Sequence, residues 1–193
     1  MARPHSDVFI AYLQRFAENT GDEETPKIDR AALATLRRSL SGQPRDVVRT
    51  FRYIGQLLPR QREAQDLYVL IAGLFAMHPM NTAEGNLGDH LAMLRDAVKA
   101  EGHNGRADTI DKRLAAMLQV RRPHLRPHLL RMITFLKAGQ VPVNWALLLR
   151  QLGNWDDPSG WVQRSWATSF WGSQNADSAR RSSSMSQQQE VSE

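Results

Sequence analysis

The sequence predicts an all-α protein, a compact bundle of about eight helices, and three observations lead to that class. Nearly every ordered stretch repeats its apolar residues at intervals of three and four, which is the period of an amphipathic helix. No pair of stretches has the alternation and the tight turn of a β-hairpin. The 193 residues suffice for one domain with a real core. We therefore expect a helical domain over residues 1–172 and a disordered Ser/Gln-rich tail over residues 173–193, which has too few apolar groups to fold.

The first four helices follow from apolar stripes that are separated by polar, Gly-containing or Pro-containing turns. We expect them over about 6–18, 29–41, 47–58 and 61–78, with a loop over the acidic run 19–27. Asp29 can cap the second helix, because its side chain can accept a hydrogen bond from a free backbone N–H of the first turn. The apolar positions are Val8, Phe9, Tyr12, Leu13 and Phe16, then Leu33, Leu36 and Leu40, then Val47, Val48, Phe51, Ile54, Leu57 and Leu58, then Leu67, Leu70, Ile71, Leu74 and Phe75.

The middle of the chain continues in the same way after a loop over residues 79–88 that we expect to be mobile. The next helix carries Leu87, Leu91, Leu94 and Val98. Asp108 is the expected N-cap of the helix that follows, whose inward residues are Ile110, Leu114, Met117 and Leu118. Pro123 and Pro127 break this helix, because proline lacks a backbone N–H and clashes with the preceding turn. A further helix fits 127–138, with Leu129, Met132, Ile133 and Leu136 inward and Gly139 as its stop.

The C-terminal helices carry all five tryptophans, which are Trp145, Trp155, Trp161, Trp166 and Trp171. Asn144 is the expected cap of the first of these helices, and Asp157 before Pro158 is expected to start the last one. Aromatic rings beside basic residues can serve as stacking platforms for single-stranded bases. The helical spacing of these rings with Leu and Val instead predicts that most of them lie in the core or an interface.

Positive charge is concentrated in residues 106–150. This stretch holds nine Lys or Arg against two acids, a surplus of +7 in a chain whose net charge is +5. Such a concentration, mostly of arginine, favours a surface that meets the phosphates of a polyanion. The alternative is a solvated basic face balanced by acids elsewhere in the fold. The nine cations are Arg106, Lys112, Arg113, Arg121, Arg122, Arg126, Arg131, Lys137 and Arg150.

The sequence offers little catalytic or metal-binding chemistry. It has no cysteine, which excludes disulfides, thiolate metal sites and a Cys nucleophile and suits a reducing compartment. It has no GxxxxGK[ST] phosphate loop, no GxSxG, no HExxH and no EF-hand pattern. His124 and His128 are four apart, but Pro127 lies between them and no third ligand is near in sequence. We expect no enzyme activity, cofactor, metal or small-molecule substrate. The other histidines are interpreted as a helix end, His78, and as surface residues, His90 and His103.

The chain also shows no sign of a membrane segment. No apolar run approaches the roughly 20 residues that a membrane-spanning helix needs. The N-terminal residues MARPHSDVF lack the apolar segment of a secretory signal. We therefore expect a soluble cytoplasmic protein.

Four short motifs occur in the order of one protein family. They are DRAALATLRRSL (Asp29–Leu40), LLRMITFL (Leu129–Leu136), VNWALLLRQLGNW (Val143–Trp155) and WVQRSWATSFW (Trp161–Trp171). Together with the length, the helical pattern and the basic stretch, this ordered set resembles the CasB family, the small subunit of the type I-E CRISPR surveillance complex Cascade. The resemblance covers most of residues 6–171 and leaves the Ser/Gln-rich tail outside.

The resemblance implies a non-catalytic subunit of an RNA-guided antiviral complex, present as two head-to-tail copies. Its implied partners are the backbone subunit that holds the guide RNA, the large subunit that recognises the PAM, a second copy of itself, and the target and non-target DNA strands. The family's basic surface holds DNA, above all the displaced non-target strand of the R-loop. The nuclease is a separate recruited protein.

Mapping the family's basic positions onto this chain gives eight nucleic-acid-binding candidates. Arg38 is favoured within the pair at the end of the second helix, and Arg60 can take the place of Arg62. Where some members carry a further basic pair after the Trp motif, this chain has Asp156-Asp157. The eight candidates are Arg37, Arg38, Arg62, Arg113, Arg121, Arg122, Arg126 and Arg131. For any one of them, the alternative is a surface salt bridge.

Two other functions stay open when only the residues are considered. One is a helix-turn-helix regulator that reads the major groove as a symmetric dimer, although no compact helix pair with a Gly turn and base-reading side chains is present. The other is a structural hub whose basic face binds an acidic protein.

Overall fold

Helices make up most of the part of the chain that the structure, a computed structural model, describes, namely residues 5–17 and 29–172. Their order and bounds are α1 (His5–Ala17), α2 (Arg30–Arg38), η1 (Ser39–Ser41), α3 (Pro44–Ile54), η2 (Gly55–Leu57), α4 (Arg62–Met77), α5 (Leu87–Ala100), α6 (Asn104–Leu118), η3 (Arg122–His124), α7 (Leu125–Ala138), α8 (Trp145–Gly153) and a last helix over residues 161–172. The described residues contain one isolated β-bridge, Asn81 with Val143, and no strand. The all-α prediction is confirmed. The predicted loop 19–27 and the predicted tail 173–193 lie outside the described residues.

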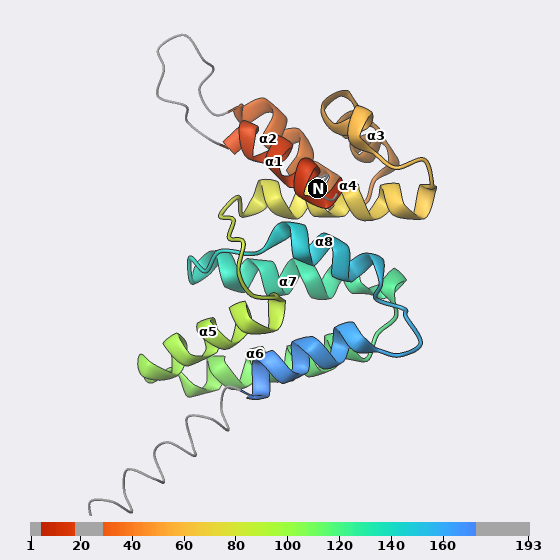
Figure 1. Cartoon of the computed structure of the whole chain (residues 1–193). Helices are drawn as coiled ribbons and strands as arrows, with labels where there is room; N and C mark the ends of the chain where they lie inside the picture. The colour runs from red at the N-terminus through yellow and green to blue at the C-terminus, as the bar shows by residue number, and fades with distance from the viewer. Residues whose placement is uncertain (1–4, 18–28, 173–193) are drawn as a thin grey trace, which may run out of the picture.

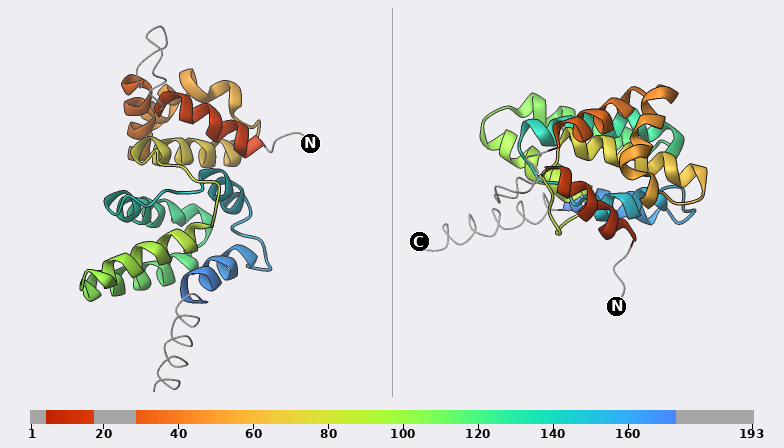
Figure 2. Two further views of the ribbon diagram at one scale, coloured as in Figure 1. Left: turned by 60° about the vertical axis from the view of Figure 1, so that its left-hand side comes forward. Right: turned by 90° about the horizontal axis from the view of Figure 1, so that it is seen from above.

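The helices stack in three layers (Figure 1). Helices α1, α2 and α3 lie on one side of α4, and α4 packs on α8 and α7 below it. The third layer holds α5, α6 and the helix over residues 161–172, with α6 against α7. The connection 79–86 runs down one side of the molecule, past α7 and α8, from the end of α4 to the start of α5 (Figures 1 and 2).

The core consists mainly of the apolar faces that the periodicity predicts. Ile110, Leu114 and Met117 of α6 are fully buried, and so are the four predicted inward residues of α7. The exceptions are Val8 on α1, which is 42% exposed, and two residues of α3, Val48 at 67% and Phe51 at 41%. The stripe of α3 is therefore only partly covered, because α3 packs on α2 and the 3-10 turns rather than between two layers.

Three of the five tryptophans form part of this core. Trp145, Trp155 and Trp166 are buried, and each indole N–H donates a hydrogen bond: to Met80 O at 3.1 Å, to Val120 O at 2.8 Å and to Gln151 Oε1 at 2.7 Å. A buried indole N–H needs such a partner, since an unpaired donor would cost free energy. The prediction that most of these rings belong to the core is confirmed.

Two predicted caps are present and two are not. Asp29 accepts from the Ala32 N–H at 2.8 Å, and Asn144 accepts from the Leu147 N–H at 3.0 Å. The Asp108 prediction is wrong: α6 begins at Asn104, one turn earlier, because Gly102 takes a left-handed φ of 82° and turns the chain directly from α5 into α6.

The Asp157 prediction is also wrong. Its carboxylate accepts from the Ser159 N–H at 2.9 Å within a turn, and the last helix begins at residue 161, after Gly160 with φ 61°. Asp and Ser close such turns as readily as they cap helices, so the Asp-Pro signal marked the turn before the helix.

The connection 79–86, which we expected to be mobile, is hydrogen-bonded to the segment before α8. The Val143 N–H donates to Met80 O at 3.1 Å, and Asn144 Nδ2 donates to Ala83 O at 2.8 Å. His90 was expected at the surface, but it is buried, with Nε2 at 3.0 Å from Glu84 O. His90 is buried because this loop folds back over the start of α5 and covers the imidazole.

Candidate nucleic-acid interface

The eight candidate arginines sit on four parts of the fold. Two end α2, one starts α4, one lies on α6, and the other four lie in η3 and α7 or just before them. Six of the eight are exposed, whereas Arg122 and Arg126 are half-buried. Within residues 5–17 and 29–172, none of the eight side chains forms a salt bridge. The surface-salt-bridge alternative therefore does not describe them in this structure.

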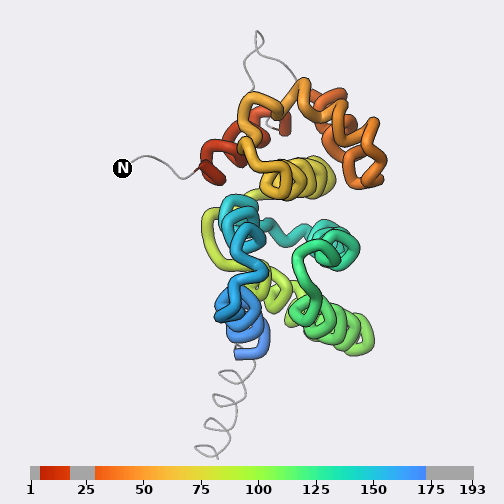
Figure 3. Tube along the Cα trace, turned by 90° about the vertical axis from the view of Figure 1, so that its right-hand side faces the viewer, coloured from red at the N-terminus to blue at the C-terminus, as the bar shows by residue number. Residues whose placement is uncertain are grey.

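The structure places α2, α7 and α6 along one side of the molecule. Figure 3 shows them together, with α1, α8 and the helix over residues 161–172 on the opposite side. These three helices carry Arg37, Arg38, Arg113, Arg126 and Arg131. Most of the predicted set, separated by up to 94 positions in sequence, thus comes from helices that border one side.

Within α7 the two arginines point to different flanks. Arg126 and Arg131 are five residues apart, so their side chains are rotated by about 140° around the helix axis. Arg126 faces the end of α2, where its Nη2 donates to Ser39 O at 2.9 Å. Arg131 lies on the flank of Phe135, one turn further along, and is exposed.

Arg122 and Arg126 border a groove of about 440 Å³ between α4 and the η3–α7 corner. The carboxylates of Glu63 and Asp66 line the same groove. Because acids and arginines share it, this groove has a mixed charge, and its arginines offer less attraction to a phosphate than a purely basic surface would.

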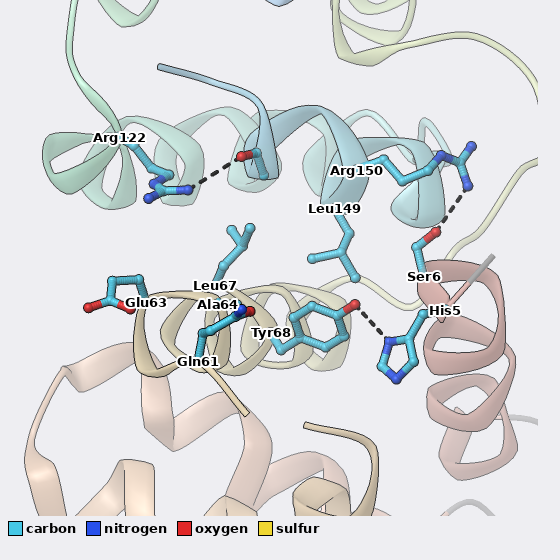
Figure 4. A pocket seen from close by; sticks show the side chains of 11 residues that line it. His5, Ser6, Gln61, Glu63, Ala64, Leu67, Tyr68, Arg122, Leu149 and Arg150 are labelled. Carbon is cyan, nitrogen blue, oxygen red and sulfur yellow. Dashed lines mark hydrogen bonds between the residues drawn. The ribbon is translucent and has the colours of Figure 1, made fainter. Parts of the chain in front are cut away.

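A second pocket of about 590 Å³ lies between α1, α4 and α8 (Figure 4). Arg122 Nη1 reaches toward Gly153 O at 3.4 Å on its wall, and the Tyr68 hydroxyl lies 2.8 Å from His5 Nδ1. Burial raises the pKa of Tyr68, so its phenol stays protonated and serves as a hydrogen-bond partner.

Arg150 is paired with an acid, so it does not add to the unpaired positive charge of the stretch 106–150. It lies by the pocket of Figure 4, and its Nη1 is 3.1 Å from Asp7 Oδ2 and 3.1 Å from the Ser6 hydroxyl. This cation ties α8 to α1. The alternative of a basic face balanced by acids elsewhere in the fold therefore holds for Arg150.

The reasoning from sequence missed one aromatic neighbour of the candidate set. The Arg113 guanidinium carbon lies 4.9 Å from the centre of the Phe135 ring, across the α6–α7 contact. Phe135 is half-buried and Arg113 is exposed. The sequence does contain a signal for this neighbour. Phe135 lies one turn after Arg131 on α7, and four other residues already form the apolar face of that helix, so Phe135 can lie beside the arginines.

In the described residues, no three His, Asp or Glu side chains gather in a way that could hold a metal ion. His124 is exposed and His128 half-buried at the start of α7. None of the described helices has both the length and the apolar character needed to span a bilayer.

Comparisons with known proteins identify the family. The model for the family described as CRISPR-associated protein Cse2 matches residues 32–171. This chain belongs to the Cse2 family. A curated Cse2 relative from Thermus thermophilus is 28% identical over 149 residues, which cover 74% of this chain and 79% of the relative. The resemblance to this family in the motifs is thereby confirmed.

Solved structures show the fold shared by these proteins. CasB from M. ruber matches with a TM-score of 0.70 and 22% identity, over 92% of this chain and 98% of that chain. A chain in a structure described as a CRISPR RNA-guided surveillance complex matches with a TM-score of 0.72 and 23% identity, over 92% of this chain and 97% of that chain. At these identities the likeness establishes the all-α fold.

The Cse2 match contains all eight candidate arginines and also Asp156-Asp157. Asp156 Oδ1 accepts from the Arg122 N–H at 3.1 Å, and Asp157 is held by Ser159. Hydrogen bonds from the Ser159 hydroxyl and then the Ser159 N–H lower the pKa of Asp157. Both acids are thus engaged in fixing the turn before the last helix.

Proposed function

We propose that this Cse2-family chain is a non-catalytic subunit of a type I-E CRISPR surveillance complex, Cascade, and that it binds DNA without sequence specificity to stabilise the R-loop and the displaced non-target strand. One observation carries the proposal. A chain of this family has, on α2, α6 and α7, the helices of one side, exposed arginines that have no acidic partner among the described residues.

The physical argument is that contacts of small free energy suffice to stabilise an R-loop. Forming an R-loop exchanges one duplex for another of similar stability, so modest contacts to the strand backbone shift the equilibrium. Arginine suits such contacts, because its planar guanidinium makes two hydrogen bonds to a phosphate and stays charged. Any protospacer must be accepted, so contacts to phosphates are preferable to contacts that read bases.

The proposed partners follow from the same role. They are the guide-RNA-bearing backbone subunit, the large PAM-recognising subunit, a second copy of this chain, and both DNA strands. The fold shared with a chain of an RNA-guided surveillance complex supports this assignment. A cytoplasmic location follows from the role.

A charge-reversal experiment in the reconstituted complex tests the proposal. The variant carries Arg37→Glu, Arg113→Glu and Arg131→Glu, three exposed positions on α2, α6 and α7. Arg122 is left unchanged, since its side chain is half-buried and its Nη1 donates to Gly153 O. We expect the R-loop lifetime to fall about tenfold or more, and the slope of log K against log salt to become shallower by about two, at roughly 0.7 per phosphate contact.

The matched control reverses three other exposed arginines, Arg15, Arg52 and Arg164, on α1, α3 and the last helix. The control should leave the R-loop lifetime within about twofold of wild type, because surface changes away from the contact matter little. If both triple variants keep the wild-type lifetime, or lose it equally, the proposed DNA contact on α2, α6 and α7 is wrong. A footprint of the isolated chain on one defined duplex would instead support the helix-turn-helix alternative.

A further inference from the structure

The contact between α6 and α7 carries an arginine that is held by an aromatic ring instead of an acid. The guanidinium carbon of Arg113 lies 4.9 Å from the centre of the Phe135 ring. Within the described residues, Arg113 makes no salt bridge and no side-chain hydrogen bond. The side chain is exposed, so the ring beneath it supports the guanidinium on one side while the other side faces solvent.

This geometry restricts where the guanidinium can go. A free arginine samples many rotamers, and ordering it on a ligand costs conformational entropy. The attraction between a guanidinium and the face of an aromatic ring holds Arg113 near one position before any ligand arrives. Phe135 is itself fixed, because it packs against the core while remaining only half-buried.

The surroundings of this pair are cationic. Arg131 lies one turn before Phe135 on the same flank of α7, and Arg106 lies seven residues before Arg113 on the same flank of α6. Both are exposed and make no described ion pair. We call the surface formed by Arg106, Arg113, Arg131 and Phe135 the α6–α7 seam.

The acids of α6 do not neutralise this seam. Asp111 accepts a hydrogen bond from the indole N–H of Trp171 at 2.9 Å, on the flank that faces the last helix. Asp108 is five residues before Arg113, which turns it away by about 140° around the helix. The seam therefore offers one ring-supported guanidinium between two exposed cations, with the acids directed elsewhere.

We infer that Arg113, supported by Phe135, stacks on an unpaired base of a single strand while Arg106 and Arg131 bind the adjacent phosphates. A guanidinium plane can stack on a base as an aromatic ring does, and every base offers such a face, so the contact needs no sequence. The bases of a duplex are already stacked on each other and cannot take this position. The seam would thus prefer a single strand to a duplex, which a phosphate contact alone does not achieve. This inference rests on the proposed function and specifies its ligand.

The test compares two probes that differ only in their bases. Fluorescence anisotropy measures the binding of the full-length protein to an oligo-dT strand and to an abasic strand of equal length, at one low salt concentration. We expect the wild-type protein to bind oligo-dT about three- to tenfold more tightly than the abasic strand. Arg113→Lys keeps the charge but removes the plane, so this ratio should fall to about one, with the salt dependence of binding unchanged.

Two further variants separate the contribution of the Phe135 ring from that of the positive charge at Arg131. Phe135→Leu keeps an apolar side chain but removes the ring, and it should lower the same ratio toward one. Arg131→Lys keeps a phosphate-binding charge and should leave the ratio at the wild-type value. Thermal unfolding of each variant accompanies the binding measurement, and Arg113→Lys, at an exposed position, should unfold as the wild type does.

The outcomes distinguish this inference from the proposed function. If Arg113→Lys keeps the full preference for oligo-dT, or if the wild type binds both probes equally with a steep salt dependence, stacking at Arg113 is wrong and the phosphate contact stands. If the wild type binds neither probe even at low salt and the charge-reversal variant keeps its R-loops, both are wrong.

Discussion

At the scale of the residue, the candidate arginines divide by what their side chains already contact. Arg126 donates to the Ser39 carbonyl, and its guanidinium lies against Gly42, where an added Cβ would be 2.8 Å from Nη1. Arg131 is exposed and makes no such contact with any residue that the structure describes. The two therefore have different roles in the same helix, which their residue type and spacing alone do not reveal.

Replacing each of the two by alanine should separate these roles. Arg126→Ala removes a charge-assisted hydrogen bond that joins α7 to η1, so the free energy of unfolding should fall by about 1–2 kcal/mol. Arg131→Ala should change it by less than about 0.5 kcal/mol. Urea unfolding followed by circular dichroism measures both. Equal losses in the two variants would contradict the structural role of Arg126.

Arg95 shows most clearly which features of single residues cannot be predicted from the sequence. It sits among the apolar residues of α5 and is only 1% exposed. Its Nη1 donates to Phe170 O at 2.6 Å, its Nε donates to Asp96 at 2.8 Å, and its guanidinium lies over the Phe170 ring. The last helix supplies Phe170 from 75 positions away. No local pattern identifies a cation whose partner comes from a distant helix.

At the scale of the element, apolar periodicity predicted the buried faces well. The face that a helix buries is set by all the apolar residues of its stripe together, so no single residue decides it. The four inward residues of α7 show this, since any rotation of the helix would expose some of them. Helix ends depend instead on one or two residues. Asp108 and Asp157 have the right chemistry for a cap, but a left-handed Gly102 and the turn at Ser159 set the helix starts elsewhere.

The contact between α5 and the last helix depends on a glycine that periodicity does not mark. A Cβ on Gly88 would lie 2.2 Å from the backbone oxygen of Trp166, so the two helices can approach only because Gly88 has no side chain. Asn86 strengthens the same contact, because its Nδ2 donates to the Ser169 hydroxyl at 2.8 Å.

Gly88→Ala should therefore separate α5 from the last helix. We expect the free energy of unfolding to fall by about 2–3 kcal/mol, the usual cost of overpacking a rigid contact. Gly105→Ala is the matched control, because Gly105 occupies the same second position of α6 and an added Cβ would meet nothing within 4 Å. Chemical denaturation of both variants gives the comparison, and an unchanged midpoint for Gly88→Ala would show that the helices can move apart freely.

At the scale of the whole molecule, the connection 79–86 joins the layer of α4 to the layer of α5 (Figure 2). A buried histidine stands near each end of it. His78 Nε2 lies 2.7 Å from Val141 O, and His90 Nε2 lies 3.0 Å from Glu84 O. Both nitrogens face carbonyl oxygens, so each carries a proton and donates. Sequence reasoning placed His78 at a helix end but not in the interior, since its partner is 63 positions away.

These two histidines should make the stability of the molecule depend on pH. Burial lowers the pKa of both side chains from the ordinary value of 6.5, and for His78 the charge of Lys137 lowers it further. The unfolded chain then binds protons more readily than the folded one, so the free energy of unfolding falls as the pH drops from about 7 through 6.5 toward the folded-state pKa values. Each histidine contributes at most about 1.4 kcal/mol per pH unit to this slope.

Urea unfolding between pH 7.5 and pH 5.5, above the range in which most carboxylates titrate, measures the slope. The double variant His78→Gln, His90→Gln keeps an N–H donor at both sites but does not ionise, so its stability should be nearly constant over this interval. His124→Gln is the control at an exposed position and should leave the slope as in the wild type. If the double variant loses stability with falling pH as steeply as the wild type, the pH dependence arises from other groups, and the two buried imidazoles do not control how firmly the connection 79–86 holds the layers together.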